Sequence, residues 1–172
     1  NMIVKTNYFW KIPGRRQNFL ANGDMLLVDR VVGITEFGPF RFAECFVRLA
    51  DEQVDSFNLI VLLNSIEFQG PSIPTKELFS IREEMINSGA LDSSEAREKF
   101  FQNPYFNAVQ IKYAYAVTCH KSQGGQWDNI FVYQGYLTED MLDLGYYRWL
   151  YTAITRATKK LNLVGFHEKF ID

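Results

Sequence analysis

The chain has 172 residues, of which 47% are hydrophobic and 16% aromatic, so it can bury a substantial core and intrinsic disorder is excluded. Its 18 basic and 20 acidic residues give a formal charge of −2, which excludes a surface that binds nucleic acid through net charge alone. Any contact with nucleic acid must therefore come from a local group of residues.

The two cysteines, Cys45 and Cys119, form no CxxC pair, and the chain has two histidines. This composition argues against a disulfide framework and against a metal site, and it favours a reducing compartment, so we expect a cytoplasmic protein. No segment resembles a signal peptide, and no apolar run is long enough to span a bilayer, so we expect no membrane partner.

The first two thirds of the chain alternate apolar and turn residues in a pattern typical of strands, followed by helical patterns. "MIVKTNY" predicts a short strand, and the segments 25–53 and 57–68 predict a small β-barrel or meander. "TKELFSIREEMINSG" predicts a helix capped by Thr75 and closed by Gly89. A second helix is expected over "SSEAREKFFQN", with Ser93 or Ser94 as its N-cap.

After Pro104 the pattern changes to strand, loop, strand, helix and strand, which indicates a parallel α/β sheet. Strands are predicted for "AVQIKYAYAVT", "NIFVYQG" and "KKLNLVGF", and a helix interrupted near Gly145 for "TEDMLDLGYYRWLYTAITRAT". We therefore predict an α/β domain made of residues 1–22 and 108–172. Residues 23–107 are predicted to form a β-rich insertion with helices.

Two nucleotide-binding motifs are absent from this sequence: GxxxxGK[ST] and GxGxxG. "FVRLADE" resembles a strand that ends in the acidic pair of a Walker B motif. Because no phosphate loop precedes it, a strand entering an acidic turn is the better interpretation.

The stretch "VTCHKSQGGQW" concentrates polar residues between apolar runs. Cys119 and His120 do not suit a nucleophile–base pair, since neighbours on a strand point to opposite faces. A loop at the carboxyl end of a strand would present His120, Lys121, Ser122 and Gln123 where ligands of parallel sheets bind. Gly124 and Gly125 would let backbone amides approach an anion. A solvated polar loop remains the alternative.

"RWLYTAITRATKK" forms a second polar group. On a helix, one stripe would hold the polar residues Arg148, Thr152, Thr155, Arg156 and Lys159, and Trp149, Leu150, Ala153, Ile154 and Ala157 would be buried. A solvated basic helix face is the alternative, but the small neighbours of Arg156 suit an arginine that reaches a phosphate.

"YAYAVTCHKSQGGQWDNIFV" resembles motif V of superfamily 1 helicases, and "LYTAITRATKKLNLVG" resembles their motif VI. The form "TxHKSQG" is most similar to the RecD-like branch, whose C-terminal module is the UvrD-like C-terminal helicase domain. "NMIVKTNY…NGD" resembles the entry of that branch into its inserted SH3-like domain. Here Met25-Leu26 replaces the small or glycine-bearing continuation usual after "NGD", and residues 45–105 carry no assigned motif.

This resemblance implies a RecA-like motor domain 2A without its own P-loop, which closes on an N-terminal motor domain of the same polypeptide. ATP and Mg²⁺ would be held mainly by that other domain. By position, Arg156 would be the catalytic arginine finger, and Gly124 and Gln126 would join it in binding ATP. DNA would be contacted by Thr118, His120, Lys121 and Ser122.

The resemblance implies a bacterial ATP-dependent DNA helicase that moves 5′ to 3′ on single-stranded DNA and unwinds duplex DNA. Because the Walker A and B motifs are absent, the fragment alone is expected not to hydrolyse ATP. The alternative is a RecA-like module that binds DNA or protein without catalysis. The sequence does not indicate an oligomeric state.

Overall fold

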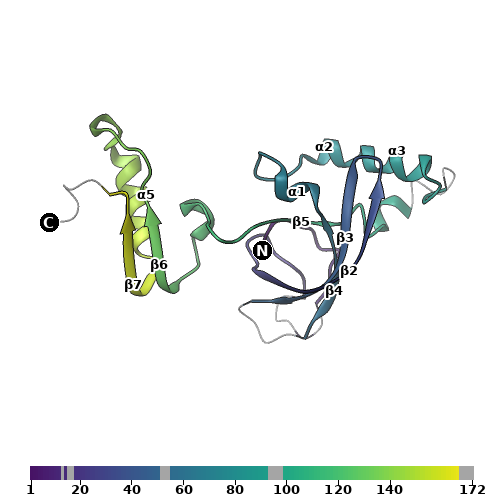
Figure 1. Ribbon diagram of the computed structural model, residues 1–172, viewed down its shortest axis with the longest axis horizontal. Coiled ribbons are helices and arrows are strands. Elements are labelled where there is room, and N and C mark those ends of the chain that lie inside the picture. The colour runs from purple at the N-terminus through teal and green to yellow at the C-terminus, as the bar shows by residue number, and fades with distance from the viewer. Residues whose placement is uncertain (13, 15–17, 51–54, 93–98, 167–172) are drawn as a thin grey trace. The chain divides into compact units, whose positions relative to one another are not determined.

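In the computed structural model the chain divides into unit 1 (Asn1–Tyr115) and unit 2 (Ala116–Asp172), each with its own sheet (Figure 1). The structure describes all residues except 13, 15–17, 51–54, 93–98 and 167–172. Within the described parts of the chain, every helix is too short or too polar to cross a bilayer.

Unit 1 is built around a five-stranded sheet in the order β1-β5-β4-β3-β2. Its strands are β1 (Met2–Lys5), β2 (Leu26–Phe37), β3 (Phe40–Leu49), β4 (Phe57–Leu62) and β5 (Val109–Lys112). All neighbouring pairs are antiparallel except β4 and β5, which are parallel. A bridge between Met2 and Met25 joins the two outer strands at one end, so the sheet closes on itself there.

Two apolar clusters hold unit 1 together. The first fills the closed sheet with buried aliphatic side chains such as Ile3, Val47 and Leu59. The second packs the far end of the β2–β3 hairpin, including Phe42, against the helical segments. These are α1 (Asn64–Glu67), α2 (Thr75–Leu78), α3 (Ser80–Asn87) and the 3-10 turn η1 (Phe100–Gln102).

The sheet of unit 1 differs from the expected domain division. β1 and β5 pair with each other, and β5 also pairs with β4, so both strands lie with residues 23–107. The sequence pattern predicts instead that residues 1–22 and 108–112 belong with the C-terminal part. The difference arises because β1 and β5 find hydrogen-bonding partners in the β-rich region.

Of the two helix predictions in unit 1, the first needs correction and the N-caps of the second lie outside the described residues. The helix expected over 75–89 is two helices, α2 and α3, that meet at Phe79. Thr75 is not the cap, because Pro74 holds that position and the Thr75 hydroxyl accepts a hydrogen bond from Lys5 Nζ at 2.9 Å. The expected caps Ser93 and Ser94 lie outside the described residues.

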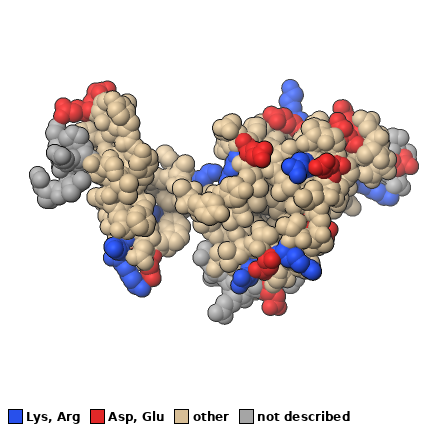
Figure 2. Space-filling view, viewed as in Figure 1, with Lys and Arg blue, Asp and Glu red and all other residues tan. Residues whose placement is uncertain are grey.

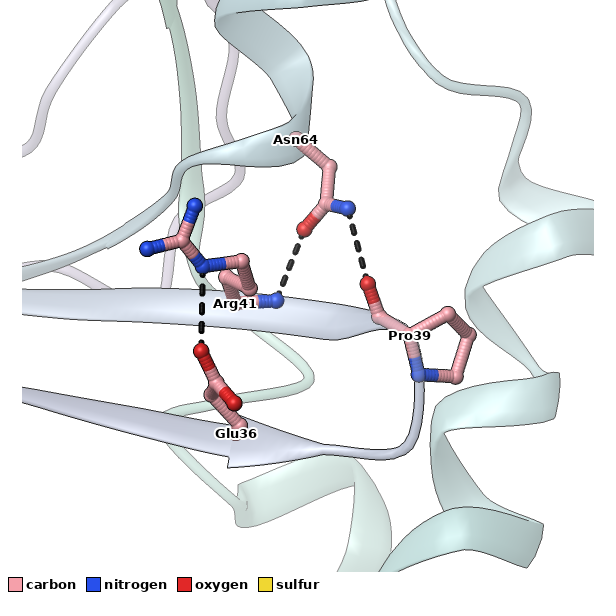
Figure 3. Close-up of polar contacts among 4 residues, drawn as sticks. All are labelled: Glu36, Pro39, Arg41 and Asn64. Carbon is pink, nitrogen blue, oxygen red and sulfur yellow. Dashed lines mark hydrogen bonds and ion pairs between the residues drawn. The ribbon is translucent and has the colours of Figure 1, made fainter.

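Asn64 fastens the turn of the β2–β3 hairpin to the start of α1 (Figure 3). Its Oδ1 accepts from the Arg41 backbone N–H at 2.7 Å, and its Nδ2 donates to the Pro39 carbonyl at 2.9 Å. The Arg41 guanidinium separately pairs with Glu36 at 3.0 Å, on side chains that are more than half exposed.

Replacing Asn64 with alanine is therefore expected to lower the free energy of unfolding of unit 1 by about 1–2 kcal/mol, because two hydrogen bonds are lost. Urea denaturation followed by circular dichroism measures this change. The matched control is Arg41→Ala, which removes a solvent-exposed ion pair and should cost less than about 1 kcal/mol. A larger loss in the control than in Asn64→Ala would contradict the role given to the amide.

Unit 2 contains a two-stranded parallel sheet of β6 (Trp127–Tyr133) and β7 (Ala157–Val164), with α5 (Leu144–Ile154) against one face (Figure 1). Two 3-10 turns, η2 (Cys119–Ser122) and η3 (Glu139–Met141), complete the unit. The predicted strand–helix–strand alternation with parallel strands is confirmed for β6, α5 and β7.

Two boundaries in the C-terminal part were predicted wrongly. The strand expected over 108–118 ends at Lys112 and belongs to the sheet of unit 1, since β1 and β4 provide its partners. The helix expected over 138–158 is predicted to be interrupted near Gly145, and α5 does start there, after its N-cap Asp143, whose Oδ1 accepts from the Tyr146 N–H at 2.8 Å; only its predicted C-terminal end is wrong. It ends at Ile154, because the following residues pair with β6 as β7.

Candidate functional site

The polar stretch of the sequence folds as a tight turn that precedes β6. The backbone N–H groups of Lys121 and Ser122 donate to the Thr118 carbonyl at 2.9 and 3.1 Å, and Ser122 Oγ donates to the Cys119 carbonyl at 2.7 Å. The turn exposes the side chains of Thr118, His120 and Lys121 and buries Ser122. Ser122 thus stabilises the turn itself, and its predicted contact with DNA stays a prediction.

This geometry corrects the expected strand-end placement. Cys119 and His120 lie in the 3-10 turn η2 and not on a strand. The turn leads into the amino end of β6, whereas the sequence analysis expected it at the carboxyl end of a strand. The reason is that the chain is no longer hydrogen-bonded as a strand beyond Lys112.

The two glycines after the turn have different structural roles. Gly124 has φ +85° with open space around its Cα, a conformation that side chains rarely adopt. Its N–H donates a hydrogen bond to none of the described residues. A Cβ on Gly125 would lie 2.4 Å from the Trp127 ring, so Gly125 lets the indole pack over the backbone.

Arg156 is held against this glycine pair from the end of α5. Its Nη1 donates to the Gly125 carbonyl at 3.3 Å, its Nε to the Thr152 carbonyl at 3.0 Å and its Nη2 to Thr155 Oγ1 at 3.1 Å. The Arg156 carbonyl in turn accepts from the Trp127 N–H at 2.9 Å. All these acceptors are neutral, so within the described structure no carboxylate compensates the guanidinium charge.

The structure therefore brings together three predicted residues and separates others. Gly124 and Arg156 lie on the same small site, where the chain enters β6 and β7, and Gln126 is exposed beside it. Lys159 lies on β7, where its ammonium pairs with Asp128 at 2.8 Å. The prediction that Arg156 and Lys159 continue the helical stripe of Arg148 and Thr152 is wrong, because α5 ends at Ile154.

The charges of unit 2 are polarised along its sheet. Figure 2 shows Lys and Arg side chains gathered, beside acidic atoms, at the end where β6 and β7 begin, and Asp and Glu side chains at the opposite end. Arg156 and the lysines of β7 contribute to the first group, and Glu139 and Asp140 of η3 contribute to the second. An anion is thus favoured at the end that holds Arg156.

The Cys119 thiol is part of the packing between η2 and α5. Its Sγ donates to the Trp149 carbonyl at 3.3 Å. Burial raises the pKa of this thiol, and the Arg156 charge and the hydrogen bond with Ser122 oppose the rise only in part. A raised pKa leaves the thiol protonated at neutral pH, which does not suit a nucleophile.

A hollow of about 270 Å³ lies beside the turn, between η2 and α5. The turn contributes Cys119, His120 and Gln123 to its wall, and α5 contributes side chains spaced by three or four residues. These include Arg148, Trp149 and Thr152. From the sequence, Trp149 is expected to be buried, and the hollow is not predicted, although this spacing on the helix is a signal for it.

The comparisons with known proteins bear on unit 2. Residues 113–164 match the UvrD-like helicase C-terminal domain. This UvrD-like segment covers under a third of the 172-residue chain and includes both the turn and Arg156. No match to a curated protein was found. The match supports a helicase-type function and, with it, nucleic-acid binding.

Proposed function

We propose that the chain is the C-terminal motor domain of a bacterial RecD-like, ATP-dependent DNA helicase. In this proposal ATP hydrolysis drives movement on single-stranded DNA, 5′ to 3′, and unwinding of duplex DNA. The observation that carries the proposal is the placement of Arg156, an arginine without a carboxylate partner among the described residues, against the Gly124–Gly125 backbone.

The groups at this site fit a phosphate and not a metal ion. Arg156 supplies N–H donors with a positive charge, and Gly124 supplies a free amide, both of which favour an anion. Bound ATP supplies the phosphoryl group that water accepts. Arg156 would stabilise the charge that develops on the γ-phosphate, and Gln126 would contact the nucleotide from the same loop. Mg²⁺ would be held by the N-terminal motor domain, which carries the phosphate loop.

The turn that precedes the glycines is suited to hold DNA. Thr118, His120 and Lys121 are exposed on it, and hydroxyl, imidazole and ammonium groups bind the sugar–phosphate backbone without selecting sequence. Three residues separate His120 from Gly124. A shift of the Gly125–Arg156 contact on nucleotide binding would therefore move the DNA-contacting side chains directly.

Unit 2 has an apolar surface that the proposal explains. Phe131, Tyr133 and Val164 lie on the face of the sheet away from α5, and the first two are 75% and 71% exposed. Parallel sheets are normally covered on both faces. We propose that the remaining strands and helices of a RecA-like fold cover this face in the intact polypeptide.

Most of unit 1, residues 23–107, would be the inserted SH3-like region of the helicase. The five strands of unit 1 close on themselves through the Met2–Met25 bridge, as expected for a small barrel. In this proposal it meets the duplex at the fork and acts as a wedge. Neither unit carries a phosphate loop in its sequence, so the fragment alone would not hydrolyse ATP.

The proposal is tested by replacing Lys121 with alanine in the intact polypeptide. The concentration of single-stranded DNA that gives half-maximal stimulation of ATP hydrolysis is expected to rise about tenfold, because one charge-assisted hydrogen bond to phosphate is lost. His120→Ala should act in the same direction. The matched control is Lys76→Ala, an exposed lysine of α2 in unit 1.

Three outcomes would weigh against the proposal. Unchanged DNA stimulation in both turn variants would exclude the turn as a DNA contact. Binding of DNA without any ATP hydrolysis by the intact polypeptide would favour a non-enzymatic binding module. ATP hydrolysis by the 172-residue chain alone would contradict a site divided between two motor domains.

A further inference from the structure

The hollow between η2 and α5 adjoins the glycine–arginine site, because Thr152 lines it and also accepts a hydrogen bond from Arg156 Nε, and from there it extends along α5. Arg148, which lines it, precedes Ile154 at the end of α5 by six residues, or nearly two helical turns. Its volume of about 270 Å³ corresponds to about nine water molecules. That is room for one sugar–phosphate unit but is below the usual range for a drug-sized ligand.

The charge of the hollow is positive and not compensated. The Arg148 guanidinium is exposed, and none of the described residues pairs with it. The residues that line the hollow include no Asp or Glu. His120 and Gln123 contribute further polar groups from the turn. A planar guanidinium fork in a cavity free of carboxylates is suited to a phosphate group.

Trp149 gives the hollow an apolar wall of fixed orientation. Its ring stacks on Tyr146 with 5.8 Å between the ring centroids and an interplanar angle of 28°. The carbonyl of the same residue accepts the hydrogen bond from Cys119 Sγ, which ties this part of α5 to the turn. An indole held in this way offers a surface on which a sugar or an unstacked base can pack.

We infer that the hollow binds one nucleotide unit of single-stranded DNA, with Arg148 on the phosphate and Trp149 against the sugar or base. The inference rests on the proposed function and adds Arg148 and Trp149 to its DNA-contacting residues. Because His120 lies both on the exposed turn and in the wall of the hollow, the DNA strand would continue from the turn onto α5.

The salt dependence of DNA binding tests the phosphate contact. The affinity of the 172-residue chain for an oligothymidine of about twelve nucleotides is measured by fluorescence anisotropy at salt concentrations from about 25 to about 200 mM. Over this range the Debye length passes through about 10 Å, at 0.1 M, so the screening of a phosphate contact changes measurably. One phosphate contact contributes about 0.7 to the slope of log K against log salt for a single strand. Arg148→Gln is expected to reduce the slope by about that amount, and Arg148→Lys is expected to retain it.

The matched control for the slope is Lys76→Gln, which removes one exposed charge from α2 in unit 1 and should leave the slope unchanged. An equal slope in wild type and Arg148→Gln overturns the inference and leaves the proposed function standing. Absence of salt-dependent binding by the wild-type chain overturns both. If inorganic phosphate at the same concentration as the oligothymidine displaces it, the hollow is an isolated anion site, and this result would also overturn the inference.

Fluorine NMR with 5-fluorotryptophan shows where the DNA strand binds on the protein. The chain has three tryptophans, Trp10, Trp127 and Trp149, and the Trp149 signal is assigned by its loss in Trp149→Phe. Added oligothymidine is expected to shift the Trp149 signal and to leave Trp10 in place. Equal spectra of wild type and Arg148→Gln without DNA show that the variant folds. A Trp149 signal that does not move while DNA is bound overturns the placement.

Discussion

If the proposed function holds, replacing Arg156 with alanine is expected to lower the DNA-stimulated ATP turnover of the intact polypeptide by about a thousandfold or more, with ATP affinity nearly unchanged. An arginine that stabilises the transferring phosphoryl group contributes this much to the rate, because its charge acts where charge develops in the transition state. Steady-state ATP hydrolysis at saturating DNA measures the turnover, and a fluorescent ATP analogue measures binding.

The structure explains why the guanidinium shape matters as well as its charge. Arg156 uses Nε, Nη1 and Nη2 on three separate acceptors from α5 and the glycine loop. A lysine cannot reproduce this fork, so Arg156→Lys is expected to remain at least about tenfold below wild type. Because Arg156→Lys keeps the positive charge but loses the three-point geometry, its turnover separates the effect of charge from that of geometry.

Lys159→Ala is the matched control for Arg156. This lysine lies three residues further along the chain, and its exposed ion pair with Asp128 contributes little to stability. Its variant should keep near-normal turnover. Near-normal turnover in Arg156→Ala would instead remove the arginine from the reaction and, with it, the main support for the motor assignment.

The elements that carry the candidate site were predictable from sequence, because β6, α5 and β7 follow from apolar periodicity. The roles of the glycine pair, the basic turn and Arg156 stay predictions that rest on the resemblance. Contact between Arg156 and Gly125 could not be predicted from either segment alone. It arises because β6 and β7 pair in parallel, so their preceding residues meet.

The errors of the sequence analysis also have a physical pattern. Residues 155–160 have good helix-forming character, yet β7 takes residues 157–164 because pairing with β6 outweighs local propensity. The fate of 108–118 is similar, since β5 joins a strand more than one hundred residues away in the chain. Local patterns indicate that a strand exists but not which sheet it joins.

Polar residues with structural roles were missed for a related reason. Gln110 is buried in β5, where its Oε1 accepts from the Ile73 N–H at 2.7 Å and its Nε2 donates to the Ile73 carbonyl. Ser65 likewise accepts from the Ile111 N–H at 3.0 Å from a fully buried position. Both side chains form hydrogen bonds with backbone groups that are far away in sequence, so no local motif predicts these contacts.

The core of unit 1 provides the second large expected effect. Phe42→Ala should lower the free energy of unfolding of unit 1 by about 3–5 kcal/mol, since it removes a fully buried ring and leaves a cavity. The Phe42 ring touches Phe37 and Tyr105 at centroid distances of 5.8 and 5.3 Å. Urea unfolding followed at Trp10, which lies in the same unit, measures the change.

Phe101→Ala is the matched control, because that ring is 57% exposed and its loss opens no cavity. It should cost less than about 1.5 kcal/mol, the value of aromatic contacts beyond area burial. Domains of this size are stable by about 5–15 kcal/mol, so Phe42→Ala brings unit 1 close to unfolding, whereas Phe101→Ala does not. Equal losses in the two variants would mean that the hairpin end is not a packed core. Unit 1 would then lack the rigidity that a wedge at the DNA fork requires.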